Sequence, residues 1–284
     1  MQFKRKYLYV FLAAGLIFFI QPAWAKDAVS DDKPWKKFNL DVGYSIAGVN
    51  TDLNLGVKGL GVEVDVEDFF GMDTTNSLFK LKGFWRFTDN LRHRLGFEWS
   101  SYRRDGNRSI LEDFTFEDNQ GNQITIPAGS QVNSYFDLDI YKFSYNYSFF
   151  QDDRIDLSAG IGFYWMPISI GVNSTGLIRV DESESFDAPL PTLALRADFA
   201  ITPKWFLRAS MEIFYLEIKE FKGSIYQSTV ALEYLPWKHV GFGASFDTFN
   251  LRIEADGEDY PQIDFNGAIN FNITGLMLYM KVFF

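Results

Sequence analysis

The amino-acid sequence predicts an all-β protein, a transmembrane antiparallel up-and-down β-barrel of about 10 strands (range about 8–12). Three observations predict this fold: an N-terminal export signal, many segments in which apolar residues alternate with polar or small ones, and connections of two different lengths. The chain has 284 residues, of which 47% are hydrophobic and 18% aromatic. That length suits a single β-barrel or one or two soluble domains.

The first 25 residues have the pattern of a cleavable signal peptide. Three basic residues, Lys4 to Lys6, precede an apolar run over residues 7–20, and Ala23 and Ala25 supply the small residues of a cleavage site. The run is shorter than the roughly 18 residues that a membrane-spanning helix needs, and no later stretch is apolar for that length. We expect a signal peptide over 1–25, a short periplasmic N-terminal segment over 26–36 and an outer-membrane barrel with acidic extracellular loops over 37–284.

Alternation with period two runs through most of the remaining chain. Between residues 205 and 213, for example, apolar side chains hold the odd positions, whereas Arg208 and Glu212 hold even ones. The apolar positions persist for about nine or ten residues, the length that crosses a bilayer at a tilt of ~45°. Aromatic residues gather near the ends of these runs, as in the interfacial girdles of membrane barrels: Trp99, Trp165, Trp205, Tyr234 and Trp237.

The connections predict the topology. Short turns are expected near residues 89, 152, 203 and 237, whereas longer polar segments cover about 49–75, 105–133, 173–188 and 254–266, with a short link near 219–223. Barrels of this type have short periplasmic turns and longer outer loops. Four turns and five outer links imply about ten strands with both termini in the periplasm.

Two alternatives stay open at this point. Residues 57–66 alternate again and could form an extra hairpin, which would give twelve strands in place of about ten. Between residues 135 and 149 the apolar residues change from even to odd positions. Either a β-bulge resets the phase there, or Asp137 and Asp139 stand above the bilayer.

The last strand alternates to the final residue, Phe284, and resembles the C-terminal signature of outer-membrane barrels, which the barrel-insertion machinery reads. The segments Val62–Met72 (VEVDVEDFFGM), Arg86–Arg94 (RFTDNLRHR) and Ala188–Pro191 (APLP) together resemble a family of largely uncharacterised proteobacterial outer-membrane β-barrel proteins. This resemblance covers most of the mature chain. It implies a β-barrel in the bacterial outer membrane and brings no catalytic residues.

The charge is acidic and unevenly distributed. The net charge is −10, and loss of the three basic residues of the signal peptide makes it more negative. The four longer polar segments hold 20 acidic residues against Lys58, Arg108 and Arg179. Such an acidic chain is not expected to bind nucleic acid. The acidic segments are expected to be solvated; alternatively, they bind lipopolysaccharide through divalent cations, because hard cations prefer carboxylate oxygens.

The polar positions of the strands predict a charged lumen. In a narrow barrel such charges would pair across the interior and close it, because an unpaired buried charge is costly. We expect a lumen charge network of Arg86, Arg94, Glu98, Asp156, Arg196, Asp198, Arg208, Glu212 and Glu233. Asp41, Lys80, Lys82, Arg92, Lys142, Arg154 and Asp247 are assigned to the same face.

No catalytic, cofactor-binding or metal-binding residue is predicted. The chain has no cysteine and only two histidines, His93 and His239, both expected beside short turns at the periplasmic end. We therefore expect a plugged barrel with a structural or surface-interaction role and no enzymatic activity. A small selective channel and an outer-membrane hydrolase or lipid-modifying enzyme remain the alternatives. The expected partners are outer-membrane lipid and lipopolysaccharide, and transiently the insertion machinery and periplasmic chaperones.

Overall fold

The computed structural model describes residues 34–55, 62–111, 113–117, 123–175, 180–218, 221–260 and 263–284. The predicted signal peptide and its cleavage site, with Ala23 and Ala25, lie outside the described residues, as does the first half of the candidate hairpin at 57–66. Among the residues described, no helix is long and apolar enough to cross a membrane.

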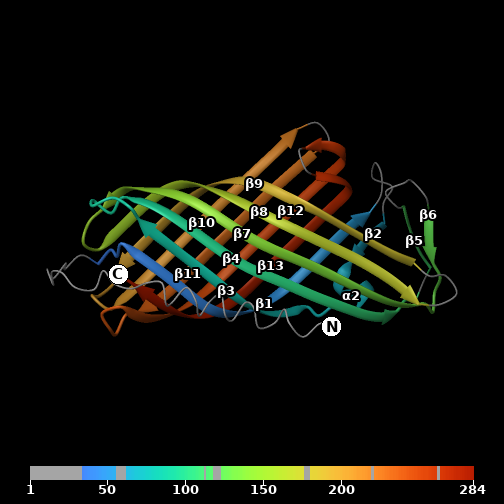
Figure 1. Ribbon diagram of the computed structural model, residues 1–284, viewed down its shortest axis with the longest axis horizontal. Helices are drawn as coiled ribbons and strands as arrows, with labels where there is room; N and C mark the ends of the chain where they lie inside the picture. Colours follow the sequence, from blue (N-terminus) through green and yellow to red (C-terminus); the bar gives the residue numbers. More distant parts are fainter. Residues whose placement is uncertain are drawn as a thin grey trace, which may run out of the picture. The chain divides into compact units, whose positions relative to one another are not determined.

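Ten long strands form one closed antiparallel barrel, which confirms the predicted fold class (Figure 1). The ten are β1 (Phe38–Leu55), β3 (Thr75–Arg86), β4 (His93–Ser109), β7 (Gln131–Gln151), β8 (Ile155–Thr175), β9 (Val180–Ala200), β10 (Trp205–Ile218), β11 (Phe221–Tyr234), β12 (Val240–Tyr260) and β13 (Ile263–Phe283). Each pairs with its neighbour in this order, and β13 also pairs with β1 from Asn39–Phe283 to Leu55–Gly267. That last pairing leaves no free edge in the barrel.

The two ends of the barrel differ, and we name them the turn end and the loop end. The turn end carries four short connections, at 87–92, 152–154, 201–204 and 235–239, together with Phe38 and the C-terminal Phe284. The loop end carries the other connections and three small elements: β2 (Val62–Asp65), α2 (Val66–Phe70) and the hairpin of β5 (Phe114–Glu117) and β6 (Gln123–Ile126). In Figure 1 these small elements lie at the end opposite the C-terminus.

Two predictions about connections are corrected. Residues 173–188 and 254–266 were expected to be outer loops, yet β8 and β9 continue to Thr175 and from Val180, and β12 and β13 leave only residues 261–262 between them. The acidic residues of these segments therefore belong largely to extended strands.

Strand β2 does pair with β1, from Asp52–Asp65 to Leu55–Val62, but it is an addition beside the ten barrel strands and not part of a twelve-stranded barrel.

The apolar and polar faces of the strands exchange halfway along the barrel. On β13 the outward side chains change from Asn270, Asn272 and Thr274 near the loop end to Leu276, Leu278 and Met280 near the turn end. The inward side chains change in the opposite sense, from Ile269, Phe271 and Ile273 to Met277, Tyr279 and Lys281. Strand β12 has the same inversion, with Phe249, Leu251 and Ile253 inward near the loop end and Ser245 and Asp247 inward below them.

The same inversion explains the change of phase that the sequence shows between residues 135 and 149. On β7, Leu138 and Ile140 are buried inside, whereas Asp137 and Asp139 point outward and are partly exposed. The register shift in β7 lies between Ser148 and Phe150, so no bulge resets the phase at the exchange. Of the two alternatives, the outward position of the two aspartates is the one that agrees with the structure.

The turn-end half is apolar outside and charged inside, and the loop-end half is polar outside and apolar inside. A lipid-facing wall must be apolar, and a wall in water must hide its apolar side chains. Twenty-one-residue strands such as β8 span ~70 Å along their length, more than the ~25 Å apolar band of a membrane barrel requires even at a tilt of ~45°. The turn-end half therefore suits the bilayer and the loop-end half suits water.

Candidate functional site: the barrel interior

Charged side chains from all ten barrel strands fill the turn-end half of the interior. Among the described residues the basic members are Lys80, Lys82, Arg86, Arg94, Lys142, Arg196, Arg208 and Lys281, and the acidic members are Asp41, Glu98, Asp156, Asp198, Glu212, Glu233 and Asp247. Alternation places each of them on the inward face of its strand. They form two layers, which we name the arginine cluster and the lysine cluster.

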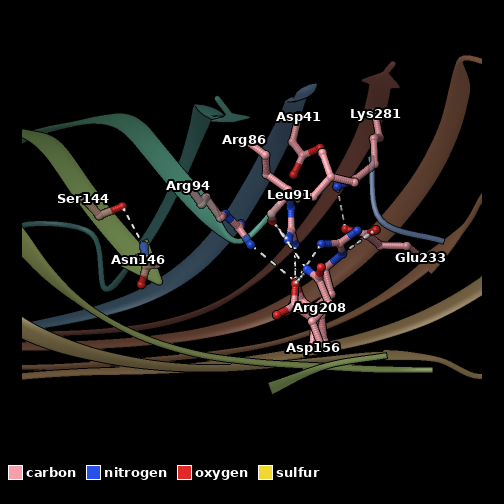
Figure 2. Close-up of polar contacts among 12 residues, drawn as sticks. Asp41, Arg86, Leu91, Arg94, Ser144, Asn146, Asp156, Arg208, Glu233 and Lys281 are labelled. Carbon is pink, nitrogen blue, oxygen red and sulfur yellow. Dashed lines mark hydrogen bonds and ion pairs between the residues drawn. The ribbon is translucent and has the colours of Figure 1, made fainter. Parts of the chain in front are cut away.

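The arginine cluster lies nearest the turn end, and its arginines converge on Asp198. Figure 2 shows Arg86, Arg94 and Arg208 pointing toward one another beside Asp156. The Oδ2 atom of Asp198 is 3.1 Å from Arg208 and 3.3 Å from Arg94. Arg86 makes a closer ion pair of 2.6 Å with Asp156 and donates a hydrogen bond of 2.6 Å to the carbonyl of Leu91. Arg86, Arg94 and Arg208 therefore each have an acidic partner, although Asp198 serves more than one of them.

Glu233 extends the arginine cluster towards β13. It lies 2.7 Å from Nε of Arg208 and 2.7 Å from Nζ of Lys281, and it accepts a hydrogen bond of 2.9 Å from the hydroxyl of Tyr279. Lys281 in turn lies 3.0 Å from Asp41. This chain of contacts joins β10, β11, β13 and β1 across the seam where the barrel closes.

The lysine cluster lies farther from the turn end than the arginine cluster, and its bases and acids are paired in the same way. Lys142 is 2.9 Å from Glu212 and 3.1 Å from Glu98, and Lys82 is 3.5 Å from Glu98 and 3.2 Å from Asp247. The hydroxyl of Tyr164 donates a hydrogen bond of 2.9 Å to Glu212. These contacts tie β3, β4, β7, β8, β10 and β12 together.

Apolar side chains close the interior at both ends of the charged layers. At the turn end, Trp35 is buried with Leu91, Phe206, Leu235 and Phe283, and its indole nitrogen donates a hydrogen bond of 2.6 Å to the carbonyl of Asp152. A larger apolar core fills the loop-end half and includes residues that are almost fully buried: Phe136, Leu138, Met166, Ile253, Ile269 and Phe271.

The short helix α2 is inserted into this apolar core by a buried ion pair. Glu67 pairs with Arg104, and the same carboxylate accepts a hydrogen bond of 2.9 Å from the backbone nitrogen of Thr51. Gly106 permits the close approach, because a Cβ at that position would lie 2.4 Å from the carbonyl oxygen of Phe70. The interior is therefore occupied from the turn end to the loop end.

The structure places all nine residues of the predicted lumen network inside the barrel. Eight of them have an ion-pair partner within 4.0 Å; Arg196 lines the interior but has none among the described residues. Arg154 is a correction: it was assigned to the lumen, and it is exposed in the turn before β8 because the strand begins one residue later. Phe284 continues the seam, since its backbone nitrogen donates to the carbonyl of Phe38 over 3.0 Å.

Three interior charges were missed by the sequence analysis. Lys281 shares its parity with Tyr279, so the alternation of the last strand was a usable signal. Arg104 belongs to a segment that was assigned to the boundary of an outer loop, although it alternates with its neighbours. Glu67 comes from a helix of five residues, and nothing in the sequence indicates that this helix folds into the barrel.

The two histidines lie at the turn end, as the topology predicts. Nδ1 of His93 is 2.8 Å from the hydroxyl of Tyr145, and Nδ1 of His239 is 3.1 Å from the carbonyl of Phe283. Over the part of the chain that the structure describes, no group of three or more acidic or histidine side chains is arranged to hold a metal ion.

Comparisons with known proteins agree with this architecture. The sequence profile described as "Outer membrane protein beta-barrel domain" matches residues 11–234, whereas no curated protein sequence matches the chain. The outer membrane protease OmpT from Escherichia coli is similar in structure, with 8% identity and a TM-score of 0.53 over 93% of this chain and 100% of that one.

Two further solved structures give weaker matches. The attachment invasion locus protein Ail of Yersinia pestis has 12% identity and a TM-score of 0.33 over 88% of this chain and 100% of its own. The toluene transporter TodX of Pseudomonas putida has 7% identity and a TM-score of 0.35 over 87% of this chain and 89% of its own. At these identities the likeness to OmpT shows the fold alone, and the two weaker matches support no argument.

Proposed function

Because the chain belongs to the outer membrane protein beta-barrel domain family and is a bacterial outer-membrane β-barrel, we propose that it is a closed barrel with a structural or surface-interaction role. The occupied interior is the observation that carries this proposal. Ions that cross the lumen would have to pass the Trp35 cluster, two layers of paired charges and the apolar core around Phe136 and Phe271. Water-filled pores have wider barrels, typically of about 16–18 strands.

The loop-end half supplies the surface for interaction. It is polar outside and packed inside, and α2 is fixed in it by the buried pair of Glu67 and Arg104. We propose that this half stands outside the cell, with both termini in the periplasm, and that its acidic segments contact lipopolysaccharide through divalent cations. A packed loop end would present these groups in a fixed arrangement, which favours recognition because little conformational entropy is lost on binding.

A small selective channel is the second candidate. The observation that favours it is a cavity of about 80 Å³ in the charged half of the interior. For this cavity to belong to a pathway, both apolar closures would have to open. No catalytic role is proposed for His93 or His239, because their contacts are to a tyrosine and a backbone carbonyl.

Conductance across planar bilayers separates the two candidates. The purified full-length mature protein should give no steady current under conditions in which a porin of the same preparation quality conducts. A double variant, Phe136→Ala with Phe271→Ala, removes the stacked pair whose ring centroids are 5.3 Å apart. It should also give no steady current, because the Trp35 cluster and the charged layers still close the lumen. Steady ohmic steps from the wild type would replace the closed-barrel proposal with the channel.

The lipopolysaccharide contact is tested separately. The thermal midpoint of the barrel should be higher in membranes that contain lipopolysaccharide and Mg²⁺ than in the same membranes with a chelator. Phospholipid membranes without lipopolysaccharide are the control, in which the chelator should change nothing. An equal effect of the chelator in both membranes would contradict the contact.

A further inference from the structure

The cavity in the charged half of the interior has a strongly cationic wall. Its volume is about 80 Å³, and six basic side chains line it: Lys82, Arg94, Lys142, Arg196, Arg208 and Lys281. Only three carboxylates, those of Asp41, Glu98 and Glu233, share the wall. A water molecule needs roughly 10–15 Å³ on this measure, so the cavity has room for one small ion and several waters.

Five of the six basic side chains are already compensated. Lys82 and Lys142 share Glu98, and Arg208 and Lys281 share Glu233, each within 3.5 Å. Arg94 lies 3.3 Å from Asp198. These carboxylates are therefore committed to cations other than Arg196.

Arg196 is the exception. Among the described residues no carboxylate lies within 4.0 Å of its guanidinium, and its buried Nε has no hydrogen-bond partner. The nearest acid along its own strand face, Asp198, already lies within 4.0 Å of Arg86, Arg94 and Arg208. Asp198 and Glu212 attract Arg196 only over a longer distance. A guanidinium without a close counter-charge in a closed interior is costly, and a bound anion would remove this cost.

The count of interior charges also indicates one positive charge without a counter-charge. Over the described residues, the turn-end half holds eight basic and seven acidic side chains, so one positive charge is in excess. One monovalent anion would balance it, whereas a divalent anion would leave an excess of negative charge. The wall also offers hydroxyl groups from Ser144 and Ser210, which can donate hydrogen bonds to an anion.

We propose that the cavity binds one small monovalent anion, such as chloride, against the guanidinium of Arg196. The anion completes the charge balance of the two layers and is a structural component of the barrel, held between strands β4, β7, β9 and β10. This site is distinct from the surface role proposed above and does not depend on it.

Bromide locates the site directly, because it replaces chloride and scatters anomalously. Crystals of the wild-type protein grown or soaked in sodium bromide should show an anomalous peak inside the barrel, within hydrogen-bonding distance of the Arg196 guanidinium. A map with no such peak in the cavity would overturn the proposal, and this experiment does not depend on whether any variant folds.

Stability provides the second measurement. At equal ionic strength, the thermal midpoint of the wild type should be roughly 2–4 °C higher in sodium chloride than in sodium gluconate, whose anion is too large for the cavity. The Arg196→Gln variant should have the same midpoint in both salts, and in gluconate it should be more stable than the wild type, because it buries no unbalanced charge.

Arg103→Gln is the matched control. Arg103 is an outward-facing arginine that pairs with Asp137 and Asp139 on β7, so its loss should leave the chloride effect intact. The same chloride effect in Arg196→Gln and in the wild type would overturn the assignment to Arg196. Since the conductance experiment measures a different property, either proposal can fail while the other stands.

Discussion

Glu212 and Glu217 lie on the same strand, β10, in opposite surroundings. Glu212 is 2% exposed and contacts Lys142 and Tyr164, whereas Glu217 is exposed and pairs with Lys222 at the surface. Removing one partner of a buried pair leaves the other charge without compensation. We expect Glu212→Gln to lower the free energy of unfolding by roughly 3–5 kcal/mol and Glu217→Gln to leave it nearly unchanged.

Urea unfolding of both variants in the same detergent measures this difference. Because strand and substitution are the same, the comparison isolates the surroundings of the carboxylate. Equal midpoints for the two variants would mean that water screens the interior charges and that the lysine cluster does not hold the strands together.

Because of Asp152, which lies in the turn between β7 and β8, we expect the stability of the folded protein to depend on pH. Its carboxylate accepts hydrogen bonds of 2.7 Å from the backbone nitrogens of Arg154 and Ile155, which hold the pKa of Asp152 below its ordinary value of 3.8. Since the pKa is lower in the folded state, the stabilisation is present above pH ~4 and is lost as the pH falls through the folded pKa.

The Asp152→Ala variant should therefore be less stable than the wild type at pH 6, and the two should converge as the pH falls through the folded-state pKa of Asp152. Unfolding midpoints across this pH range provide the measurement. Asp153→Ala is the control, since the neighbouring side chain is also exposed and makes none of these backbone contacts. A difference in stability that does not shrink as the pH is lowered would show that the carboxylate charge has no part in the turn.

At the level of elements, the pairing of β13 with β1 predicts that the last two residues are needed for assembly. Phe283 is buried beside Trp35, and the backbone of Phe284 bonds to Lys37 and Phe38. Deleting both residues should reduce folded, heat-modifiable barrel in the outer membrane and increase periplasmic degradation. Leu278→Ala, on the same strand and 71% exposed, is the control and should assemble normally; wild-type assembly of the deletion would contradict the insertion signal.

The strands could be predicted from the sequence because alternation is a local property of each segment. The four short turns and the strand count follow from the same pattern, and the structure has them where the sequence places them. The lengths of the strands could not be predicted in this way. Near the loop end the apolar residues move to the inward face, as Phe249, Leu251 and Ile253 do on β12. The strands there lose the pattern that is expected of a membrane strand, and the segment that follows, 254–266, therefore looks like a loop in the sequence.

The membership of the interior charge layers could also be predicted, but their pairing could not. Parity places Arg86 and Asp198 inside from the sequence alone, since each alternates with apolar neighbours. Which carboxylate meets which base depends on the stagger of non-adjacent strands, as in the contact of Lys82 on β3 with Asp247 on β12. Alternation within one strand contains no information about that stagger.

For the whole molecule, the proposed orientation predicts which end of the barrel is accessible to reagents that are added outside the cell. The chain has no cysteine, so single cysteines can be introduced without interference. Leu111, which is 80% exposed at the loop end, should react as Leu111→Cys with a membrane-impermeant maleimide on intact cells. Asp153→Cys, at the exposed turn end, should react only after the outer membrane is permeabilised; the reverse result would invert the orientation.

The exchange of apolar and polar faces also determines how deeply the molecule is immersed. Displacement by one residue pair towards the turn end, about 6–7 Å along each strand, would draw Thr248 and Thr274 into hydrocarbon and push as many apolar residues into the headgroups. Every strand of the barrel has this free-energy cost, so small costs per side chain sum to a large cost of displacement for the whole barrel. The barrel therefore has one preferred depth of insertion in the bilayer. A molecule that binds to the loop end does so at a constant height above the lipid surface.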